Sequence, residues 1–192
     1  MTDYYQPDFY RFNEDSLSLV SFILKQSLKT SSLLDIGSGS GVIGIELARI
    51  LKPQDLILLE LQKDFIPFLE KNSDLFLTDE TRVEIVVSSL GAWDSNKAFD
   101  LIACNPPYYL PGHGQESDDQ RRNLCRNFKQ DGWEVLITKI SQWLAPSGRA
   151  FIVLKNDPLL ITNCERFLEG SCLNKILHVE KQLCFLELYP RD

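Results

Sequence analysis

The chain has 192 residues, of which 44% are hydrophobic and 24% are charged, and its formal net charge is −7. This length supports one domain with a sizeable core, and the composition excludes a disordered or fibrous protein. The negative charge argues against generic nucleic-acid binding, which rests on Lys and Arg side chains that neutralise phosphates, so a nucleic-acid partner would need a local basic patch.

The first thirty residues combine an aromatic-rich segment with a predicted helix. Apolar residues at helical spacing over 14–29 predict an amphipathic helix, with Asn13 placed to cap its first turn. The preceding residues, 4–12, are rich in aromatic side chains but too few to fold alone. They could pack onto the rest of the chain or form a flap over a ligand. We expect residues 1–30 to pack on a core built by residues 31–192, within one structural domain.

The next part of the chain alternates between strand and helix patterns. An apolar strand at 33–36 leads through a glycine-rich turn at 37–41 into a helix at 42–48. The same alternation continues with strands at 56–60, 83–87 and 99–104 and a helix at 63–75. This order predicts an α/β fold with a mostly parallel sheet and helices on both faces.

The C-terminal part of the chain completes this pattern. A helix is expected at 133–144, followed by a stop and turn at 145–148 and by a short apolar strand at 150–154. The remaining elements are a helix at 159–168 and two strands at 176–179 and 183–188. No internal repeat or interdomain linker interrupts the sequence.

The sequence also bears on the cellular compartment. It contains no apolar run of membrane-spanning length, and its N-terminus lacks the basic start and apolar core of a signal peptide. We therefore expect a cytoplasmic protein that does not associate with membranes. The five cysteines are odd in number and include no Cys-x-x-Cys pair, so reduced thiols are expected, and no metal site is predicted.

The glycine turn predicts a ligand site. Gly37, Gly39 and Gly41 remove side chains where the first strand turns into a helix, which lets a ligand approach the backbone. In open α/β sheets, ligands bind beyond the carboxyl ends of the strands. Glu60 closes the second predicted strand, where its carboxylate could accept both hydroxyl protons of a ribose.

This glycine pattern is ambiguous by itself. Gly39, Gly41 and Gly44 with Glu60 downstream also fit the dinucleotide-binding fingerprint, and a tight turn beside a surface carboxylate is a third interpretation. Asp35, Asp100 and Asn105 favour a ligand with a nucleoside and an amino-acid part, because they place polar side chains at further strand ends.

The four residues Asn105-Pro106-Pro107-Tyr108 directly follow the apolar run 99–104 and predict a reaction centre for a planar nitrogen. The Asn105 side-chain oxygen and the Pro106 carbonyl oxygen could accept the two hydrogens of an amino group, and the prolines would hold these acceptors in place. Tyr108 could stack on a planar substrate, with Tyr109 or Phe12 as the second face.

A plain loop start after a buried strand is the structural alternative for this motif. Cys104, at the end of the same apolar run, could be read as a nucleophile, but a cysteine in this position is expected to be part of the core. His113 is not assigned as a general base, because a nitrogen that becomes cationic in the reaction could lose its proton to water.

With these motifs, the sequence resembles the class I S-adenosylmethionine-dependent methyltransferases over roughly residues 30–155. The resemblance implies a single-domain, Rossmann-like fold with a seven-stranded, mostly parallel sheet whose last strand is antiparallel. It makes residues 31–192 the methyltransferase domain, with S-adenosyl-L-methionine as cofactor, S-adenosyl-L-homocysteine as product, and catalysis at residues 105–108. The cofactor-binding residues it implies are Asp35, Gly37, Gly39, Gly41, Glu60, Leu61, Ser89 and Asn105.

Within this class, the sequence is most similar to the bacterial enzymes that methylate adenine N6 beside the anticodon of a valine tRNA. That similarity rests on Gln6-Pro7, on the segment 10–16, on Gly41-Val42-Ile43 and on residues 105–109 followed by an Arg-rich loop. It implies an RNA partner, namely tRNA, and a monomer. Substrate contacts are then expected from Phe12, Tyr109, Arg121, Arg122 and Arg126.

Other interpretations stay open. The arginines of the loop 111–130 could instead pair with acidic residues on a solvated helical face. The chain is acidic overall, and Ser88-Ser89-Leu90 lacks the acidic residue that many members of the class use near the cofactor adenine. Methylation of a glutamine in a protein, a noncatalytic cofactor-binding or RNA-binding module, and a nucleotide-binding oxidoreductase are the competing functions.

Overall fold

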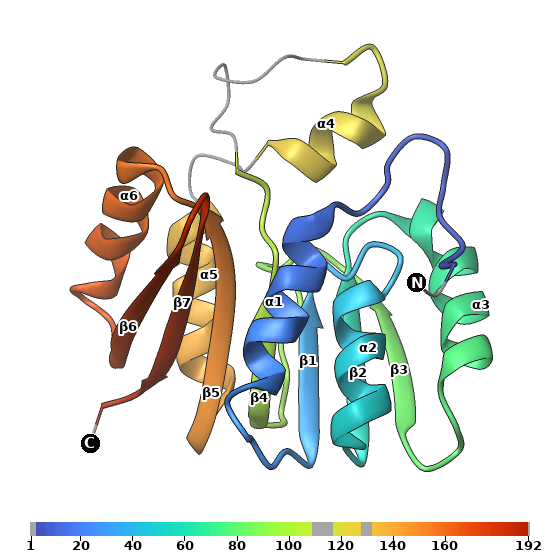
Figure 1. Ribbon diagram of the computed structural model, residues 1–192, viewed down its shortest axis with the longest axis horizontal. Helices are drawn as coiled ribbons and strands as arrows, with labels where there is room; N and C mark the ends of the chain where they lie inside the picture. The colour runs from blue at the N-terminus through green and yellow to red at the C-terminus, as the bar shows by residue number, and fades with distance from the viewer. Residues whose placement is uncertain (1–2, 109–116, 128–131, 192) are drawn as a thin grey trace.

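In the computed structural model, residues 3–108, 117–127 and 132–191 are described (Figure 1). Their central feature is a seven-stranded sheet with the strand order β3-β2-β1-β4-β5-β7-β6. The strands are β1 (Ser32–Ile36), β2 (Asp55–Glu60), β3 (Arg82–Val87), β4 (Phe99–Cys104), β5 (Leu144–Lys155), β6 (Leu173–Glu180) and β7 (Leu183–Pro190). The helices are α1 (Glu14–Leu24), α2 (Val42–Leu51), α3 (Ile66–Phe76), α4 (Gln120–Arg126), α5 (Gly132–Trp143) and α6 (Pro158–Leu168), with a 3-10 turn η1 (Lys63–Phe65).

The directions of the strands confirm the predicted sheet. β1 pairs in parallel with β2 and β4, while β3 and β5 continue the parallel pairing outward. The last strand, β7, is antiparallel to both of its neighbours, β5 and β6. The order in which successive strands are added across the sheet therefore reverses at β1, because β2 and β3 lie on one side of it and β4 and β5 on the other.

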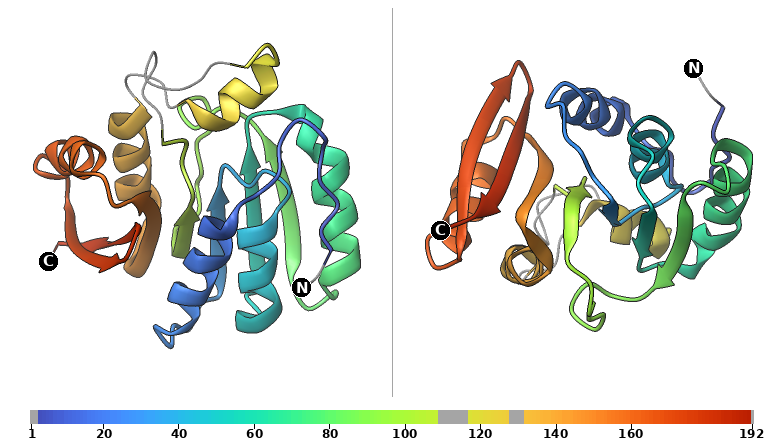
Figure 2. Two further views of the ribbon diagram at one scale, coloured as in Figure 1. Left: turned by 45° about the horizontal axis from the view of Figure 1, so that its top comes forward. Right: turned by 90° about the horizontal axis from the view of Figure 1, so that it is seen from below.

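Helices cover both faces of the sheet (Figure 2). Leu33 of β1 packs in the cluster that includes α1, α2 and α3, whereas Leu34 and Ile36 pack in the cluster that includes α5 and α6. Because both faces are covered, every residue of β1 except Ser32 is buried. In place of a helix, the link between β3 and β4 covers the sheet with Trp93, whose ring centroid lies 4.7 Å from that of Trp143.

The aromatic segment before α1 packs on the helices. The Tyr4 side chain is buried, and its hydroxyl donates to Glu46 of α2 at 2.9 Å. The buried Asn72 of α3 accepts from the Tyr5 N–H and donates to the Tyr5 and Ser40 carbonyl oxygens. Asn72 thus ties the segment before α1 to the glycine turn.

Several local expectations were wrong. α1 ends at Leu24 rather than at residue 29, and the Asn13 side chain donates to Asp15 at 2.8 Å instead of capping the helix. Residues 145–148 are not a separate turn but lie within β5, where the register with β4 shifts. Gly148 permits this shift, because a Cβ atom there would lie 2.6 Å from the Phe99 carbonyl oxygen.

Gly44 provides a test of how closely α2 packs on the sheet. A Cβ atom at Gly44 would lie 2.7 Å from Leu58 Cδ2 and 3.0 Å from the Asp35 side chain. We expect Gly44→Ala to lower the free energy of unfolding by about 1–3 kcal/mol, because overpacking a close-packed interior forces neighbours apart. Urea denaturation measures the loss.

Gly170→Ala is the matched control. A Cβ atom at Gly170 would meet no atom within 4 Å. Its free energy of unfolding should stay within about 0.5 kcal/mol of the wild-type value. Equal losses for the two variants would contradict the close approach of α2 to β1 and β2.

Candidate active site

A cavity of about 340 Å³ opens beyond the carboxyl ends of β1, β2 and β4. It lies next to β1, where the strand order reverses, which is the position at which open α/β sheets bind ligands. Its volume falls in the range of about 300–1,000 Å³ that is typical of small-molecule sites. The wall that the strand ends contribute includes Ile36, Leu59, Glu60 and Cys104.

The glycine turn forms one wall of the cavity. Gly37 and Gly39 line it with positive φ angles of 72° and 54°. The turn is fixed from beneath, since the Leu59 carbonyl oxygen accepts the Gly37 N–H at 2.8 Å. A Cβ atom at Gly37 would meet no atom within 4 Å, so the turn leaves room beside its backbone for a ligand.

Gly41 and Asp35 do not line the cavity, although both were predicted to bind the cofactor. A Cβ atom at Gly41 would collide with Ile45 and Leu69, so this glycine lets α2 pack against α3. Asp35 is fully buried, and its Oδ2 accepts the Gly44 N–H at 2.9 Å, which fixes the start of α2. Burial raises the pKa of the Asp35 carboxyl to about 7.

Glu60 presents a buried carboxylate at the end of β2. Its Oε2 accepts the Gly39 N–H and its Oε1 accepts the Gln62 N–H, both at 2.8 Å. Burial raises the pKa of Glu60, although the backbone N–H donors lower it in part. Each carboxylate oxygen has a further lone pair, so two ligand hydroxyls can still be bound, as a ribose requires.

The two segments that follow β2 and β3 complete the floor of the cavity. Leu61 and Ser89, which the resemblance assigns to the cofactor, line it together with Leu90 and Gln62. The Gln62 Nε2 donates to the Cys125 Sγ at 3.2 Å, whereas its buried Oε1 has no hydrogen-bond partner within the described residues. An apolar slot of this kind suits a planar heterocycle.

Asn105, Pro106 and Pro107 follow β4 and line the opposite wall. The Asn105 amide is held at both ends, because its Nδ2 donates to the Ser16 Oγ at 3.0 Å and its Oδ1 accepts from the Tyr108 hydroxyl at 2.7 Å. The motif is therefore anchored by the first turn of α1.

Tyr108 itself stands beside the cavity rather than in its lining. Its hydroxyl lies 3.1 Å from Asp15 Oδ2, and Lys155 Nζ lies 5.4 Å from its ring centroid. Stacking of Tyr108 on a substrate stays a prediction. Burial raises the pKa of the Cys104 thiol well above its ordinary value, which disfavours the thiolate that a nucleophile would need.

α4 lies beyond the carboxyl ends of the central strands (Figure 1), and its residues Leu124 and Cys125 line the cavity together with Asn127. This helix occupies part of the predicted loop 111–130. Arg121 pairs with Asp119 at 2.8 Å and with Asp64 at 3.6 Å, so it is bound to acidic neighbours, as the alternative interpretation of the loop expected.

The remaining predicted substrate residues have separate outcomes. Arg121 also lies over the ring of Phe9, 4.5 Å from its centroid. Arg122 and Arg126 form no ion pair within 3–108, 117–127 and 132–191. Phe12 packs edge-on against Tyr4 instead of lining the cavity. Tyr109 lies outside the described residues, as do 111–116 and 128–130 of the predicted loop.

The sequence did not single out several residues that the structure brings to the site. Tyr10 lines the cavity from the aromatic segment, next to Phe65 of η1, with ring centroids 6.5 Å apart. Tyr10 is the residue of the aromatic segment 4–12 that lines the cavity, and a flap over a ligand stays a prediction. Ser16 contacts Asn105 although the two residues are 89 positions apart in the sequence, and no local sequence pattern predicts such a contact.

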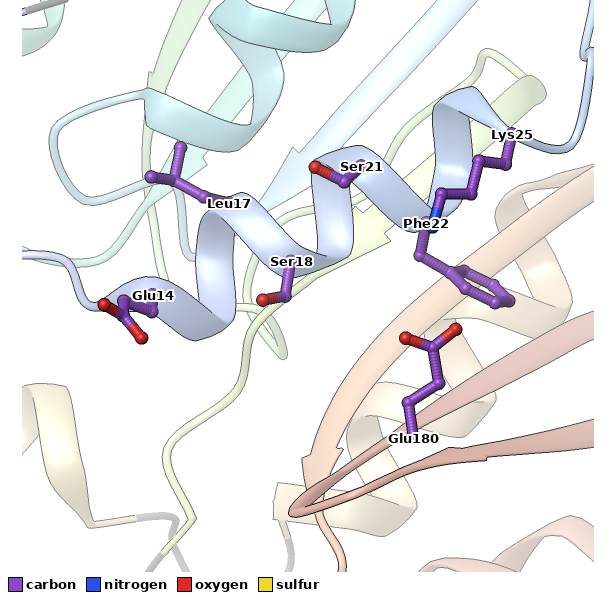
Figure 3. A pocket seen from close by; sticks show the side chains of 7 residues that line it. All are labelled: Glu14, Leu17, Ser18, Ser21, Phe22, Lys25 and Glu180. Carbon is purple, nitrogen blue, oxygen red and sulfur yellow. The ribbon is translucent and has the colours of Figure 1, made fainter. Parts of the chain in front are cut away.

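A second hollow, of about 410 Å³, lies on the outer side of α1 (Figure 3) and shares no lining residue with the first. It is lined by Glu14, Leu17, Ser18, Ser21, Phe22, Lys25 and Glu180. Within the described part of the chain, no His, Cys, Asp and Glu residues gather in a group that could hold a metal ion. Nor does any helix there have the length and apolarity to cross a bilayer.

Comparison with known proteins gives consistent matches. A family model described as methyltransferase small domain matches residues 11–171. The chain is 31% identical over 125 residues to a tRNA1(Val) (adenine(37)-N6)-methyltransferase of Glaesserella parasuis, which covers 65% of the chain and 52% of that relative. It is 36% identical over 119 residues to a release factor glutamine methyltransferase of Flavobacterium psychrophilum, covering 56% of the chain and 41% of that relative. The chain thus spans about half the length of the relatives it matches.

The fold has close counterparts among solved structures. A ribosomal protein L11 methylase from Lactobacillus delbrueckii subsp. bulgaricus superimposes with a TM-score of 0.69 at 14% identity, over 95% of the chain and 81% of that structure. At this identity the likeness concerns the fold alone. It agrees with the Rossmann-like methyltransferase fold that the sequence predicted.

The raised pKa of Asp35 predicts a pH-dependent stability. Between an unfolded pKa of about 3.9 and a folded pKa of about 7, the native state binds more protons than the unfolded state. The free energy of unfolding should therefore fall as the pH rises through this window. In Asp35→Asn this contribution disappears, while the amide oxygen can still accept the Gly44 N–H.

Chemical denaturation between pH 4.5 and 8, followed by tryptophan fluorescence, measures this effect. As the pH rises, the free energy of unfolding of Asp35→Asn should increase relative to that of the wild type. Asp79→Asn, at an exposed carboxylate, should keep the wild-type slope. Parallel pH profiles for wild type and Asp35→Asn would rule out the buried, proton-binding state of Asp35.

Proposed function

The chain belongs to the methyltransferase small domain family, and from this we propose that it methylates a planar exocyclic nitrogen, with adenine N6 in tRNA as the favoured acceptor. The observation that carries the proposal is the meeting of two half-sites in one cavity. The glycine turn and Glu60 line one side, and Asn105 and Pro106 line the other. A bound ligand on the first side would lie next to acceptors suited to an amino group on the second.

The cofactor is S-adenosyl-L-methionine, which supplies an electrophilic methyl group on a sulfonium. The residues present fit it. Gly37 and Gly39 leave their backbone open to the cavity, and Glu60 has free lone pairs for the two ribose hydroxyls. Leu61 and Leu90 line an apolar slot for the adenine ring.

The acceptor side supports chemistry on a poor nucleophile. An amino group attached to a ring donates its lone pair into the π system, so it is planar and weakly nucleophilic. The Asn105 Oδ1 and the Pro106 carbonyl oxygen can each accept one of its hydrogens and favour a more tetrahedral nitrogen. As positive charge develops on the nitrogen, both hydrogen bonds strengthen, so they stabilise the transition state more than the ground state.

The two prolines hold the acceptors in place, and the reaction does not require a general base. Pro106 and Pro107 have fixed φ angles, so the two acceptors are already in position before a substrate binds. The methylated nitrogen is cationic and acidic, and water can remove its proton.

Adenine in tRNA is favoured by the match to the tRNA1(Val) enzyme and by α4, which lines the cavity. Arg122 is exposed on α4, and Arg126 follows one turn later on the same helix, where both could contact phosphates. Tyr10 provides an aromatic face in the cavity itself. An enzyme that acts on a base must receive it unstacked, and a tRNA loop offers such bases at low energetic cost.

Methylation of a protein glutamine is the second candidate. The match to a release factor glutamine methyltransferase favours it, and a glutamine side-chain nitrogen is also planar. The same acceptors, Asn105 and Pro106, would serve both substrates. The choice between them therefore depends on surfaces outside the cavity and must be made by experiment.

Cofactor binding tests the first half of the proposal. Calorimetry should show binding of S-adenosyl-L-methionine and S-adenosyl-L-homocysteine in preference to NAD. Glu60→Gln should weaken this binding about 10- to 100-fold, since hydrogen bonds to a charged group contribute about 1.5–3 kcal/mol. Glu84→Gln, at an exposed position of β3, is the matched control and should bind as wild type does. Preferential NAD binding would favour an oxidoreductase and refute the proposal.

Methyl transfer tests the second half. Labelled S-adenosyl-L-methionine is incubated with total tRNA, total rRNA, DNA and cell protein, and the products are digested to nucleosides or amino acids. We expect label in tRNA as N6-methyladenine, and its loss by a factor of at least about 100 in Asn105→Ala, whose cofactor affinity should stay within severalfold. Label found only in protein would refute tRNA as the substrate and favour a protein glutamine. An active Asn105→Ala enzyme would refute the role of Asn105.

A further inference from the structure

The Asn105 side chain has two chemically opposite ends, and only one of them suits the proposed reaction. Its Oδ1 accepts hydrogen bonds, whereas its Nδ2 donates them. An amino group that approaches Nδ2 meets another donor and gains nothing. Rotation of the amide by 180° would therefore remove the acceptor while leaving the backbone unchanged.

Two hydroxyl groups hold the amide from its two ends. The Ser16 Oγ lies 3.0 Å from Nδ2, and the Tyr108 Oη lies 2.7 Å from Oδ1. These lengths are typical of an N–H···O and an O–H···O hydrogen bond respectively, which supports this orientation over the rotated one. Ser16 is only 6% exposed, so water does not readily replace its hydroxyl.

The Tyr108 hydroxyl has one proton and two neighbouring acceptors. Besides Asn105 Oδ1 at 2.7 Å, it faces Asp15 Oδ2 at 3.1 Å, and Asp15 Oδ2 also accepts from the Asn13 side chain at 2.8 Å. Burial and the charge of Asp15 raise the pKa of Tyr108. The phenol therefore keeps its proton, which it can donate to either acceptor, and the contact with Asn105 is the shorter of the two.

We propose that Ser16 and the hydroxyl of Tyr108 are positioning groups that fix the Asn105 amide with its oxygen available to the methyl-accepting nitrogen. This inference rests on the proposed function. Oδ1 has two lone pairs, so it can accept from Tyr108 and from a substrate N–H at the same time. The role of Tyr108 then includes its hydroxyl as well as its ring, and α1 contributes directly to the reactive geometry.

Turnover measurements on three variants test this positioning role. Tyr108→Phe keeps the aromatic ring and removes only the hydroxyl, and Ser16→Ala removes the other hydroxyl. Each should lower kcat about three- to tenfold, the amount expected for one lost neutral hydrogen bond, with little change in the KM for either substrate. Ser21→Ala is the matched control, since Ser21 lies on the same helix but faces the outer hollow (Figure 3), and its kcat should equal that of wild type.

Asp15→Ala separates the two acceptors of the Tyr108 hydroxyl. If the hydroxyl acts on Asn105, loss of the competing carboxylate leaves kcat unchanged or higher. A kcat lowered as far as in Tyr108→Phe would show that the hydroxyl acts through Asp15, and it would overturn the proposal. Each kcat is normalised to the fraction of protein that binds S-adenosyl-L-homocysteine, which removes the effect of misfolded material.

The orientation of the Asn105 amide can be measured by NMR without any methyl transfer, so this test does not depend on the proposed function. In protein labelled with ¹⁵N-asparagine, the Asn105 side-chain NH₂ signals are assigned by their loss in Asn105→Ser. Ser16→Ala should shift them strongly, and Tyr108→Phe weakly. The reverse order would mean that Nδ2 faces Tyr108, which overturns the inference even if methyl transfer occurs. The expected order without transfer to any acceptor would instead count against the proposed function alone.

Discussion

Two buried carboxylates at the ends of neighbouring parallel strands hold the glycine turn in place. Glu60 accepts the Gly39 N–H at 2.8 Å, and Asp35 accepts the Gly44 N–H at 2.9 Å. Since β1 and β2 pair in parallel, their carboxyl ends lie side by side, and these two bonds fix both the turn and the start of α2. The open backbone of the cavity depends on this arrangement, which is why two acidic side chains remain buried there despite the raised pKa of each.

The segment before β1 connects this turn with the reactive motif. Asn72 joins the Tyr5 backbone to the glycine turn, Tyr10 lines the cavity, and Ser16 holds the Asn105 amide. Cofactor and acceptor sides of the cavity therefore share one support. A change in the first turn of α1 would act on the Asn105 side-chain amide directly, although α1 lies outside the alternating strands and helices that define the sheet.

Much of the fold followed from local patterns. The central strands β1, β2 and β4 are mostly buried because both faces of the sheet are covered, and the glycine turn at 37–41 separates strand from helix clearly. The errors have physical causes. The turn expected at 145–148 is absorbed into β5 because Gly148 lets the chain pass close to Phe99 of β4. Similarly, the predicted helical pattern to residue 29 exceeds α1, which ends at Leu24.

By itself, the sequence determined the strands of the sheet, the described helices other than α4, the glycine turn with Glu60, and the Asn105-Pro106 pair at the end of β4, because each is a feature of adjacent residues. Only the tertiary structure decided which residues meet. It placed Gly41 and Asp35 in support of the turn rather than in the cavity, and Tyr10 rather than Phe12 in the cavity lining. It also gave Asn105 its partners, Ser16 and Tyr108. Parallel pairing brings these distant segments to one edge of the sheet, and no local spacing in the chain encodes such contacts.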